Sequence, residues 1–280
     1  MTFASRFADI SRQYSPFCMG VDPSRQLLRD WGLTEDAAGL ARFCDIVLKA
    51  AAGRVGICKP QAAFFEAFGP AGVAVLGDFI AQARAAGLLV IADIKRGDIG
   101  STIAAYAEGW VGADSPFGAD AVTATAYLGF GALDPLLTRA AETGAGVFLV
   151  VRSSNPEGAG LQAAQTQAGL AVADALARDI AAFNAKVAPG AVGPIGAVIG
   201  ATLGDEAIAT VQTLENSLFL VPGLGAQGAD FDDVKRLFAG ATDRILPNSS
   251  RGVLTHGPDV AALARALDEH VATAARIRDL

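Results

Sequence analysis

The stretch Leu88-Leu89-Val90-Ile91-Ala92-Asp93-Ile94 decides what kind of sheet the chain can form. It is apolar at consecutive positions rather than at alternate ones, so a strand built from it has no face suited to water. Parallel strands that are covered by helices have this continuous apolar character. We therefore predict that Leu88–Ile94 is a buried parallel strand.

Similar short runs recur along the chain and alternate with longer segments of helical spacing. The eight predicted strands are Phe17–Val21, Val55–Lys59, Leu88–Ile94, Ala121–Thr125, Gly146–Val151, Ile195–Ile199, Leu218–Val221 and Arg244–Pro247. The predicted helical segments are Thr34–Ala52, Gly72–Ala86, Thr102–Val111, Leu133–Thr143, Leu161–Lys186, Glu206–Leu214, Phe231–Phe238 and Val260–Asp279.

Eight strand–helix units predict an α/β fold, a single (β/α)8 TIM barrel that spans residues 1–280 as one domain. A doubly wound open sheet is the alternative, because periodicity does not distinguish a closed sheet from an open one. The stretch Gly158–Gln167 is low in complexity, and we expect it to begin as a loop.

Composition and charge exclude several classes of protein. The 280 residues are 52% hydrophobic and carry a net charge of −7. The composition allows a large core, and the charge argues against non-specific nucleic-acid binding.

Residues 1–17 lack the apolar run of a signal peptide. The uncharged run Val187–Gly204 is broken by proline and glycine, so we expect a loop and a strand and no membrane span. Three cysteines without CxxC spacing indicate reduced thiols in a cytoplasmic protein.

Charged residues gather at the end of the decisive strand, in Asp93-Ile94-Lys95-Arg96-Gly97-Asp98. Asp93 and Lys95 are two residues apart, so on a strand they project to the same side. Lys59 ends the preceding predicted strand and can reach Asp93. We therefore expect Lys59, Asp93, Lys95 and Asp98 to form one array of alternating charge that fixes each group before a substrate binds. A structural ion-pair network at the barrel rim is the alternative.

Two glycine-containing loops follow the last two predicted strands, where barrels commonly bind phosphate. They read Pro222-Gly223-Leu224-Gly225-Ala226-Gln227-Gly228 and Pro247-Asn248-Ser249-Ser250-Arg251-Gly252. Glycines let backbone N–H groups approach an anion, and Arg251 is a forked donor. Two ordinary turns and a surface arginine are the alternative.

Two more polar residues lie at predicted strand ends. Asp22 can accept hydrogen bonds from sugar hydroxyls, and Ser154 can bind a polar edge of a ligand, although either can also be a simple turn residue. His256 and His270 have no partner spacing, and we expect both at the surface. A histidine-based triad or a metal site is therefore not predicted.

With these motifs in place, the sequence closely resembles the orotidine 5′-phosphate decarboxylase family. The specific match is Asp-Ile-Lys-Arg-Gly-Asp-Ile-Gly-Ser-Thr at residues 93–102, in a form that looks like the longer type 2 bacterial subfamily. The resemblance runs from Asp22 through Lys59, Ser154 and the Gly-Ala-Gln-Gly loop to Arg251, and so covers most of the chain.

The resemblance implies decarboxylation of orotidine 5′-phosphate to UMP and CO₂, the last step of de novo UMP biosynthesis, with no metal or organic cofactor. It implies that Lys95 donates the proton to C6 of the pyrimidine. Asp93 would then face the substrate carboxylate, and Lys59 would connect Asp93 to the ribose.

The same resemblance implies a homodimer with shared active sites. Asp98, Ile99 and Thr102 would reach into the site of the neighbouring subunit. Within one subunit, Asp22 would hold the ribose hydroxyls and Ser154 would bind the pyrimidine.

For the phosphate, the resemblance implies a lid-like loop that begins at Pro222 and whose Gln227 touches both phosphate and base. Arg251 would bind the phosphate with help from the Ser250 backbone. The segment Ser249-Ser250-Arg251-Gly252 departs from the Gly-Arg pair of the shorter family members.

Two rival functions stay open from the sequence. One is a Mg²⁺-dependent decarboxylase or aldolase for a keto-sugar phosphate, since such barrels also carry a D-x-K-x-x-D strand. The other is a barrel that binds a phosphorylated ligand without catalysis. Metal dependence of the activity discriminates the first rival from the main interpretation.

Overall fold

Eight parallel strands close into a barrel in the order of the chain. The computed structural model describes residues 1–223 and 231–278. Its strands are β1 (Cys18–Val21), β2 (Ile57–Pro60), β3 (Leu89–Arg96), β4 (Ala121–Ala124), β5 (Gly146–Arg152), β6 (Ile195–Ile199), β7 (Phe219–Pro222) and β8 (Ile245–Ser249). Each strand pairs with the next, and β8 pairs with β1, so the closed barrel is confirmed and the open sheet is wrong.

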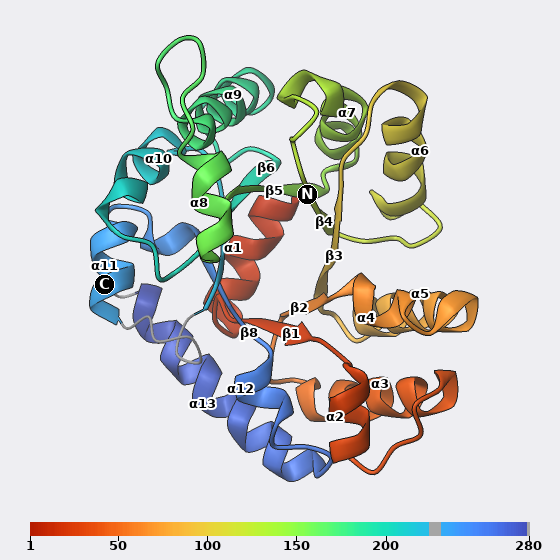
Figure 1. Cartoon of the computed structure of the whole chain (residues 1–280). Helices are drawn as coiled ribbons and strands as arrows, with labels where there is room; N and C mark the ends of the chain where they lie inside the picture. The colour runs from red at the N-terminus through yellow and green to blue at the C-terminus, as the bar shows by residue number, and fades with distance from the viewer. Residues whose placement is uncertain (224–230, 279–280) are drawn as a thin grey trace.

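Helices follow the strands around the outside of the barrel (Figure 1). The helices of at least ten residues are α1 (Phe3–Gln13), α3 (Ala37–Ala51), α5 (Gly69–Ala85), α6 (Gly100–Trp110), α7 (Asp134–Thr143), α9 (Val172–Val187) and α13 (Val260–Arg278). The shorter ones are α2 (Arg25–Asp30), α4 (Ala62–Glu66), α8 (Pro156–Gln162), α10 (Ile208–Thr213), α11 (Phe231–Leu237) and α12 (Arg251–Leu254). Three 3-10 turns complete the described elements, namely η1 (Phe130–Leu133), η2 (Asp205–Ala207) and η3 (Thr242–Arg244).

The predicted strands agree with the observed ones to within about two residues at either end, but one loop prediction and one helix prediction are wrong. Gly158–Gln167 does not begin as a loop, because α8 starts at Pro156, whose fixed φ suits the first turn of a helix. The segment Leu161–Lys186 is not one helix. Helix α8 ends at Gln162, a turn follows in which Gly169 has a φ of 76°, and α9 begins only at Val172.

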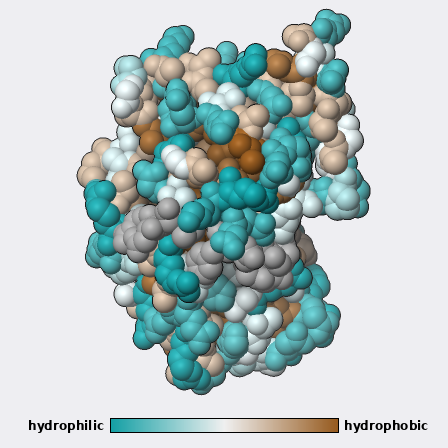
Figure 2. Space-filling view, turned by 90° about the vertical axis from the view of Figure 1, so that its left-hand side faces the viewer, coloured by the Kyte–Doolittle hydropathy of each residue, from teal (hydrophilic) through white to brown (hydrophobic). Residues whose placement is uncertain are grey.

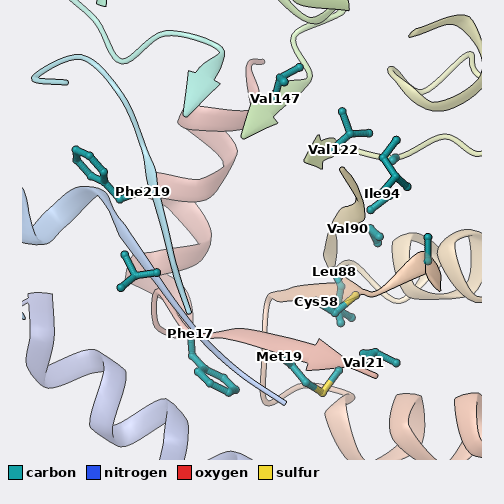
Figure 3. Close-up of a cluster of buried hydrophobic side chains, with 14 of the residues drawn as sticks. Phe17, Met19, Val21, Cys58, Leu88, Val90, Ile94, Val122, Val147 and Phe219 are labelled. Atoms are coloured by element: carbon teal, nitrogen blue, oxygen red, sulfur yellow. The ribbon is translucent and has the colours of Figure 1, made fainter. Parts of the chain in front are cut away.

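The core has two layers, one on each side of the strands. Side chains that point outward pack under the helices, among them Met19, Val90 and Phe219 (Figure 3). Side chains that point inward fill the barrel and meet Phe3 and Phe7 of α1, which closes the amino-terminal end of the barrel (Figure 1). The amino-terminal helix was not among the predicted segments. Because one end of the barrel is filled, a ligand has access to the interior from the other end.

Hydrophilic side chains are spread over the molecular face shown in Figure 2, and a group of hydrophobic ones lies in its upper half. No helix within residues 1–223 and 231–278 is both long and apolar enough to cross a membrane.

Candidate active site

The site is the last layer of inward-pointing side chains at the carboxyl end of the barrel. In β3, Leu89 and Ile91 belong to the inner apolar cluster, so the next inward position is Asp93. In β2, Ile57 lies in that cluster and the next inward position is Lys59. Along β2 and β3, the inward-pointing side chains are therefore apolar inside the barrel and charged at its carboxyl end.

Three of the predicted residues meet in this layer. Lys59 donates from Nζ to Oδ2 of Asp93 at 2.6 Å, and Lys95 donates from Nζ to Oδ1 at 2.5 Å. The side chains of Lys59 and Asp93 are 8% and 6% exposed, whereas that of Lys95 is 44% exposed. The predicted contact between neighbouring strands is therefore present, and Lys95 is the member of the trio with the freest access to a ligand.

Two further residues hold the carboxylate of Asp93, and neither was predicted from the sequence. Thr123 of β4 donates from Oγ1 to Oδ1 at 2.8 Å, and Gln61 donates from Nε2 to Oδ2 at 3.2 Å. Thr123 occupies the inward position that follows Ala121, and a polar residue at such a position in an apolar strand was the available signal.

The backbone at the end of β3 has an unusual conformation. Lys95 has a φ of 45°, the one positive value of a non-glycine residue in the described part of the chain. Such values are uncommon outside glycine and gather at functional sites. Just beyond, a Cβ on Gly97 would lie 2.3 Å from the carbonyl oxygen of Thr125, so this position of the motif requires glycine.

The charges of the trio reinforce each other. Burial alone would raise the pKa of Asp93, but the ammonium groups of Lys59 and Lys95 lower the pKa to about 2. Burial alone would lower the pKa of Lys59, but Asp93 and Asp22 raise it above its ordinary value. The buried carboxylate and the buried ammonium are therefore both ionised at neutral pH.

A cavity of about 530 Å³ opens above this layer. Besides the trio, Asp22, Pro222, Ser250 and Arg251 line it, as predicted. The backbone of β1 approaches Ser250 closely at Gly20. A Cβ added to Gly20 would lie 2.7 Å from Cβ of Ser250.

Several polar atoms in the wall of the cavity have no hydrogen-bond partner among the described residues. They are Oδ1 of Asp22, Oγ of Ser249 and Oγ of Ser250, and all three are buried. Buried polar atoms are rarely left unpaired in native proteins. These three therefore suit a ligand that brings its own hydroxyl groups and anionic oxygens.

Four predicted residues lie apart from the trio. Asp98 forms no ion pair within the described chain and accepts a hydrogen bond from the N–H of Ile99. Ile99 and Thr102 are exposed at the start of α6, and Ser154 is exposed after β5. The four-membered array expected from the sequence is thus a trio within one chain. Gln227 and its loop lie outside the described residues.

The histidines and cysteines take no part in the trio. His256 is exposed as expected, but His270 is half-buried with its ring centroid 5.4 Å from that of Phe17. The three cysteines are free and buried, and burial raises the pKa of Cys18 to about 12. Within the described ranges, no three His, Cys, Asp or Glu side chains are grouped so that they could hold a metal ion.

The chain is similar to several known proteins over most of its length. The family model described as Orotidine 5′-phosphate decarboxylase / HUMPS family matches residues 15–266. A Myxococcus xanthus protein named orotidine 5′-phosphate decarboxylase is 51% identical over 276 residues, with 99% of this chain and 96% of that protein covered. A Streptomyces coelicolor protein of the same name is 48% identical over 266 residues, with 95% and 94% covered. A Streptomyces avermitilis crystal structure, provisionally assigned to the same enzyme, is 46% identical with a TM-score of 0.94 and covers 100% of this chain and 96% of its own.

Proposed function

Because the chain belongs to the orotidine 5′-phosphate decarboxylase / HUMPS family, we propose that it is a carboxy-lyase that converts orotidine 5′-phosphate to UMP and CO₂. This reaction is the last step of pyrimidine (UMP) biosynthesis. The observation that carries the proposal is the Lys59–Asp93–Lys95 trio at the base of a cavity large enough for a nucleotide. We further propose that residues 1–280 act as one decarboxylase domain.

The chemical difficulty of this reaction is the electron pair that stays on C6 when the bond to the carboxylate carbon breaks. No carbonyl of the pyrimidine is placed to delocalise that pair. Lys95 lowers the energy of this step by its charge and then supplies the proton. Its ammonium stabilises the developing negative charge, and one of its protons then forms the new C6–H bond while CO₂ departs. Lys95 recovers a proton from water afterwards.

Asp93 has two functions in the proposed reaction. It holds the ammonium of Lys95 in place before the substrate arrives, which is the preorganisation that electrostatic catalysis needs. Its charge also faces the substrate carboxylate and favours the departure of neutral CO₂. Lys59 keeps Asp93 ionised and would donate to a ribose hydroxyl of the substrate.

The remaining groups bind parts of the substrate that do not react. Asp22, whose Oδ1 is buried and unpaired, holds the ribose hydroxyls, and Ser154 binds the pyrimidine. Arg251 binds the phosphate with the backbone of Ser250, and the loop from Pro222 closes over the substrate with Gln227 on phosphate and base. Binding energy gained at the phosphate is thereby used to assemble the reacting geometry.

We also propose a homodimer in which Asp98, Ile99 and Thr102 complete the site of the partner subunit. Asp98 has no ion pair within the described part of its own chain, so its carboxylate is available to another one. The exposed apolar side chains of Ile99, Tyr127 and Leu128 (59%, 79% and 55% exposed) follow β3 and β4 at the same end of the barrel. Their burial would favour association of two subunits.

Hybrid dimers test this part of the proposal. Lys95→Ala and Asp98→Ala proteins are each expected to be nearly inactive, but a hybrid of the two has one site with both residues intact. After subunit exchange at equal amounts, about one quarter of the sites are complete, because half of the dimers are hybrids. Recovery of roughly that fraction of activity is expected. Proven exchange without recovery would contradict shared sites.

The activity itself is tested by following the pyrimidine absorbance of orotidine 5′-phosphate with the purified protein, with and without EDTA. Turnover that EDTA leaves unchanged is expected. No turnover by folded protein would contradict the proposal. Turnover of a keto-sugar phosphate that requires Mg²⁺ would instead support the metal-dependent rival within the same family.

A further inference from the structure

Thr123 connects two members of the charged trio through one hydroxyl group. The residue is fully buried at the inward position of β4 nearest the cavity. Its Oγ1 donates to Oδ1 of Asp93 at 2.8 Å and accepts the backbone N–H of Lys95 at 2.9 Å. The single proton and one lone pair of the hydroxyl are thus both committed, the first to the carboxylate and the second to the backbone of the proposed proton donor.

The N–H of Lys95 depends on this hydroxyl because the ladder between β3 and β4 is irregular there. Ala92 pairs with Val122, but the next pair is Arg96 with Ala124, so four steps along β3 match two steps along β4. The extra residues form a bulge in which Lys95 takes its φ of 45°. Bulges often re-aim a side chain near an active site, and here Thr123 satisfies the donor that the bulge takes out of the ladder.

The hydrogen bond from Thr123 to Asp93 completes the set of donors around that carboxylate. Lys95 and Thr123 donate to Oδ1, while Lys59 and Gln61 donate to Oδ2. The carboxylate therefore has two donors on each oxygen. Its orientation is determined by side chains from β2, β3 and β4 and by Gln61, which directly follows β2.

We propose that Thr123 is a positioning residue of the decarboxylation site, which sets the direction of the Lys95 ammonium relative to Asp93 by tying the Lys95 backbone to the Asp93 carboxylate. The inference rests on the proposed function for its effect on turnover. The link itself rests only on the contacts of Thr123. The charged motif at residues 93–98 does not include Thr123, and lining the cavity does not by itself imply a positioning role for it.

Thr123→Val tests the proposal, because valine keeps the shape of threonine and removes both hydrogen bonds. We expect kcat for orotidine 5′-phosphate to fall about 10²-fold, which is the cost of a misplaced catalytic group, with a much smaller change in KM. Thr123→Ser keeps the hydroxyl and is expected to restore most of kcat. An unchanged kcat in the valine protein would overturn the inference.

Thr210→Val is the matched control. Thr210 is also fully buried, and its Oγ1 likewise donates to a carboxylate, that of Asp174, while it accepts from Nε of Arg152. Loss of that hydroxyl is expected to lower stability without the selective fall in kcat. An equal fall in both valine proteins, each measured per folded molecule, would mean that any buried hydroxyl matters and would contradict the specific role of Thr123.

A second readout does not depend on activity. The titration of Asp93 can be followed by NMR of ¹³C-labelled aspartate, with its signal assigned from Asp93→Asn. Lys59 and Lys95 act directly on this carboxylate, the thiol of Cys18 interacts with it electrostatically, and Asp22 acts on Lys59. Because Thr123→Val removes none of these groups, a rise of the Asp93 pKa in that protein, absent in Thr123→Ser and Thr210→Val, is expected from the lost hydrogen bond and the altered direction of Lys95. An unchanged titration would overturn the inference.

The two readouts separate the failure of the inference from the failure of the proposed function. If the wild-type protein does not decarboxylate orotidine 5′-phosphate, the proposed function fails, and the NMR result still shows whether Thr123 holds Asp93. If Thr123→Val does not fold, Thr123→Ala is used, and the same changes are expected. If both unfold while Thr123→Ser folds, the hydroxyl serves the fold alone and the inference is overturned.

Discussion

Each end of the barrel holds a buried aspartate between two cations, but the two arrangements differ in what they offer to a ligand. At the open end, Asp93 lies between Lys59 and Lys95. At the closed end, Asp120 lies 2.6 Å from Arg6 and 3.6 Å from Arg84, and its side chain is 3% exposed. A buried carboxylate with two cationic partners is therefore not by itself a sign of catalysis.

The difference lies in the cations and in the backbone around them. Asp120 also accepts the N–H of Val90, and its arginines come from α1 and α5, so the cluster fastens two helices to the start of β4. Arginine is not deprotonated in proteins, so this cluster has no proton to give. The lysines at the open end are compact ammonium groups that can transfer one, and Lys95 stands on a bulge with left-handed backbone beside the cavity.

The largest expected difference between the two ends is in kcat, when one cation is removed from each. Lys95→Ala should lower kcat by more than about 10⁴-fold, because it removes both the proton donor and the charge that stabilises the carbanion. Arg84→Ala should leave kcat within a few-fold of the wild type. Steady-state assays with orotidine 5′-phosphate, together with circular dichroism to verify folding, measure both. Near-normal turnover of folded Lys95→Ala would contradict the proposed mechanism.

The sequence predicts the open end of the barrel far better than the closed end. Asp93 and Lys95 are two residues apart on a strand, and Lys59 ends the strand before, so alternation and strand pairing are enough to bring the trio together. The eight strands follow from the same local pattern. All of these features depend on residues that are close in sequence or on neighbouring strands.

Other features depend on contacts that local patterns do not contain. Helix α1 is held by Phe7 inside the barrel and by Arg6 on Asp120, 114 residues later. The positive φ of Lys95 follows from a register shift between two strands, which alternation alone does not reveal. Thr123 is recognisable in the sequence as a polar residue in an apolar strand, but its two hydrogen bonds, to Asp93 and to the N–H of Lys95, depend on the irregular register of β3 and β4.

A smaller effect, on stability rather than on turnover, is expected from removing the carboxylate at the closed end. Asp120→Ala leaves the N–H of Val90 unpaired and leaves Arg6 and Arg84 side by side, so the free energy of unfolding should fall by about 1–3 kcal/mol. The kcat per folded molecule should stay within a few-fold of the wild type. Urea unfolding and active-site titration check the two parts. A large loss of kcat in folded protein would show that the closed end influences the reaction.

The smallest effect expected is the pH dependence of stability that Asp93 causes. Its pKa of about 2 in the folded protein lies below its ordinary value of 3.8, so its contribution is present above pH ~4 and is lost as the pH falls toward 2. Between pH 5 and pH 3 the wild-type protein should therefore lose ~1 kcal/mol more unfolding free energy than Asp93→Asn, which cannot titrate there. Urea unfolding at the two pH values and one protein concentration measures the difference. Equal losses in the two proteins would mean that the lysines do not hold Asp93 ionised, and the contrast between the two ends of the barrel would then rest on the bulge and the cavity alone.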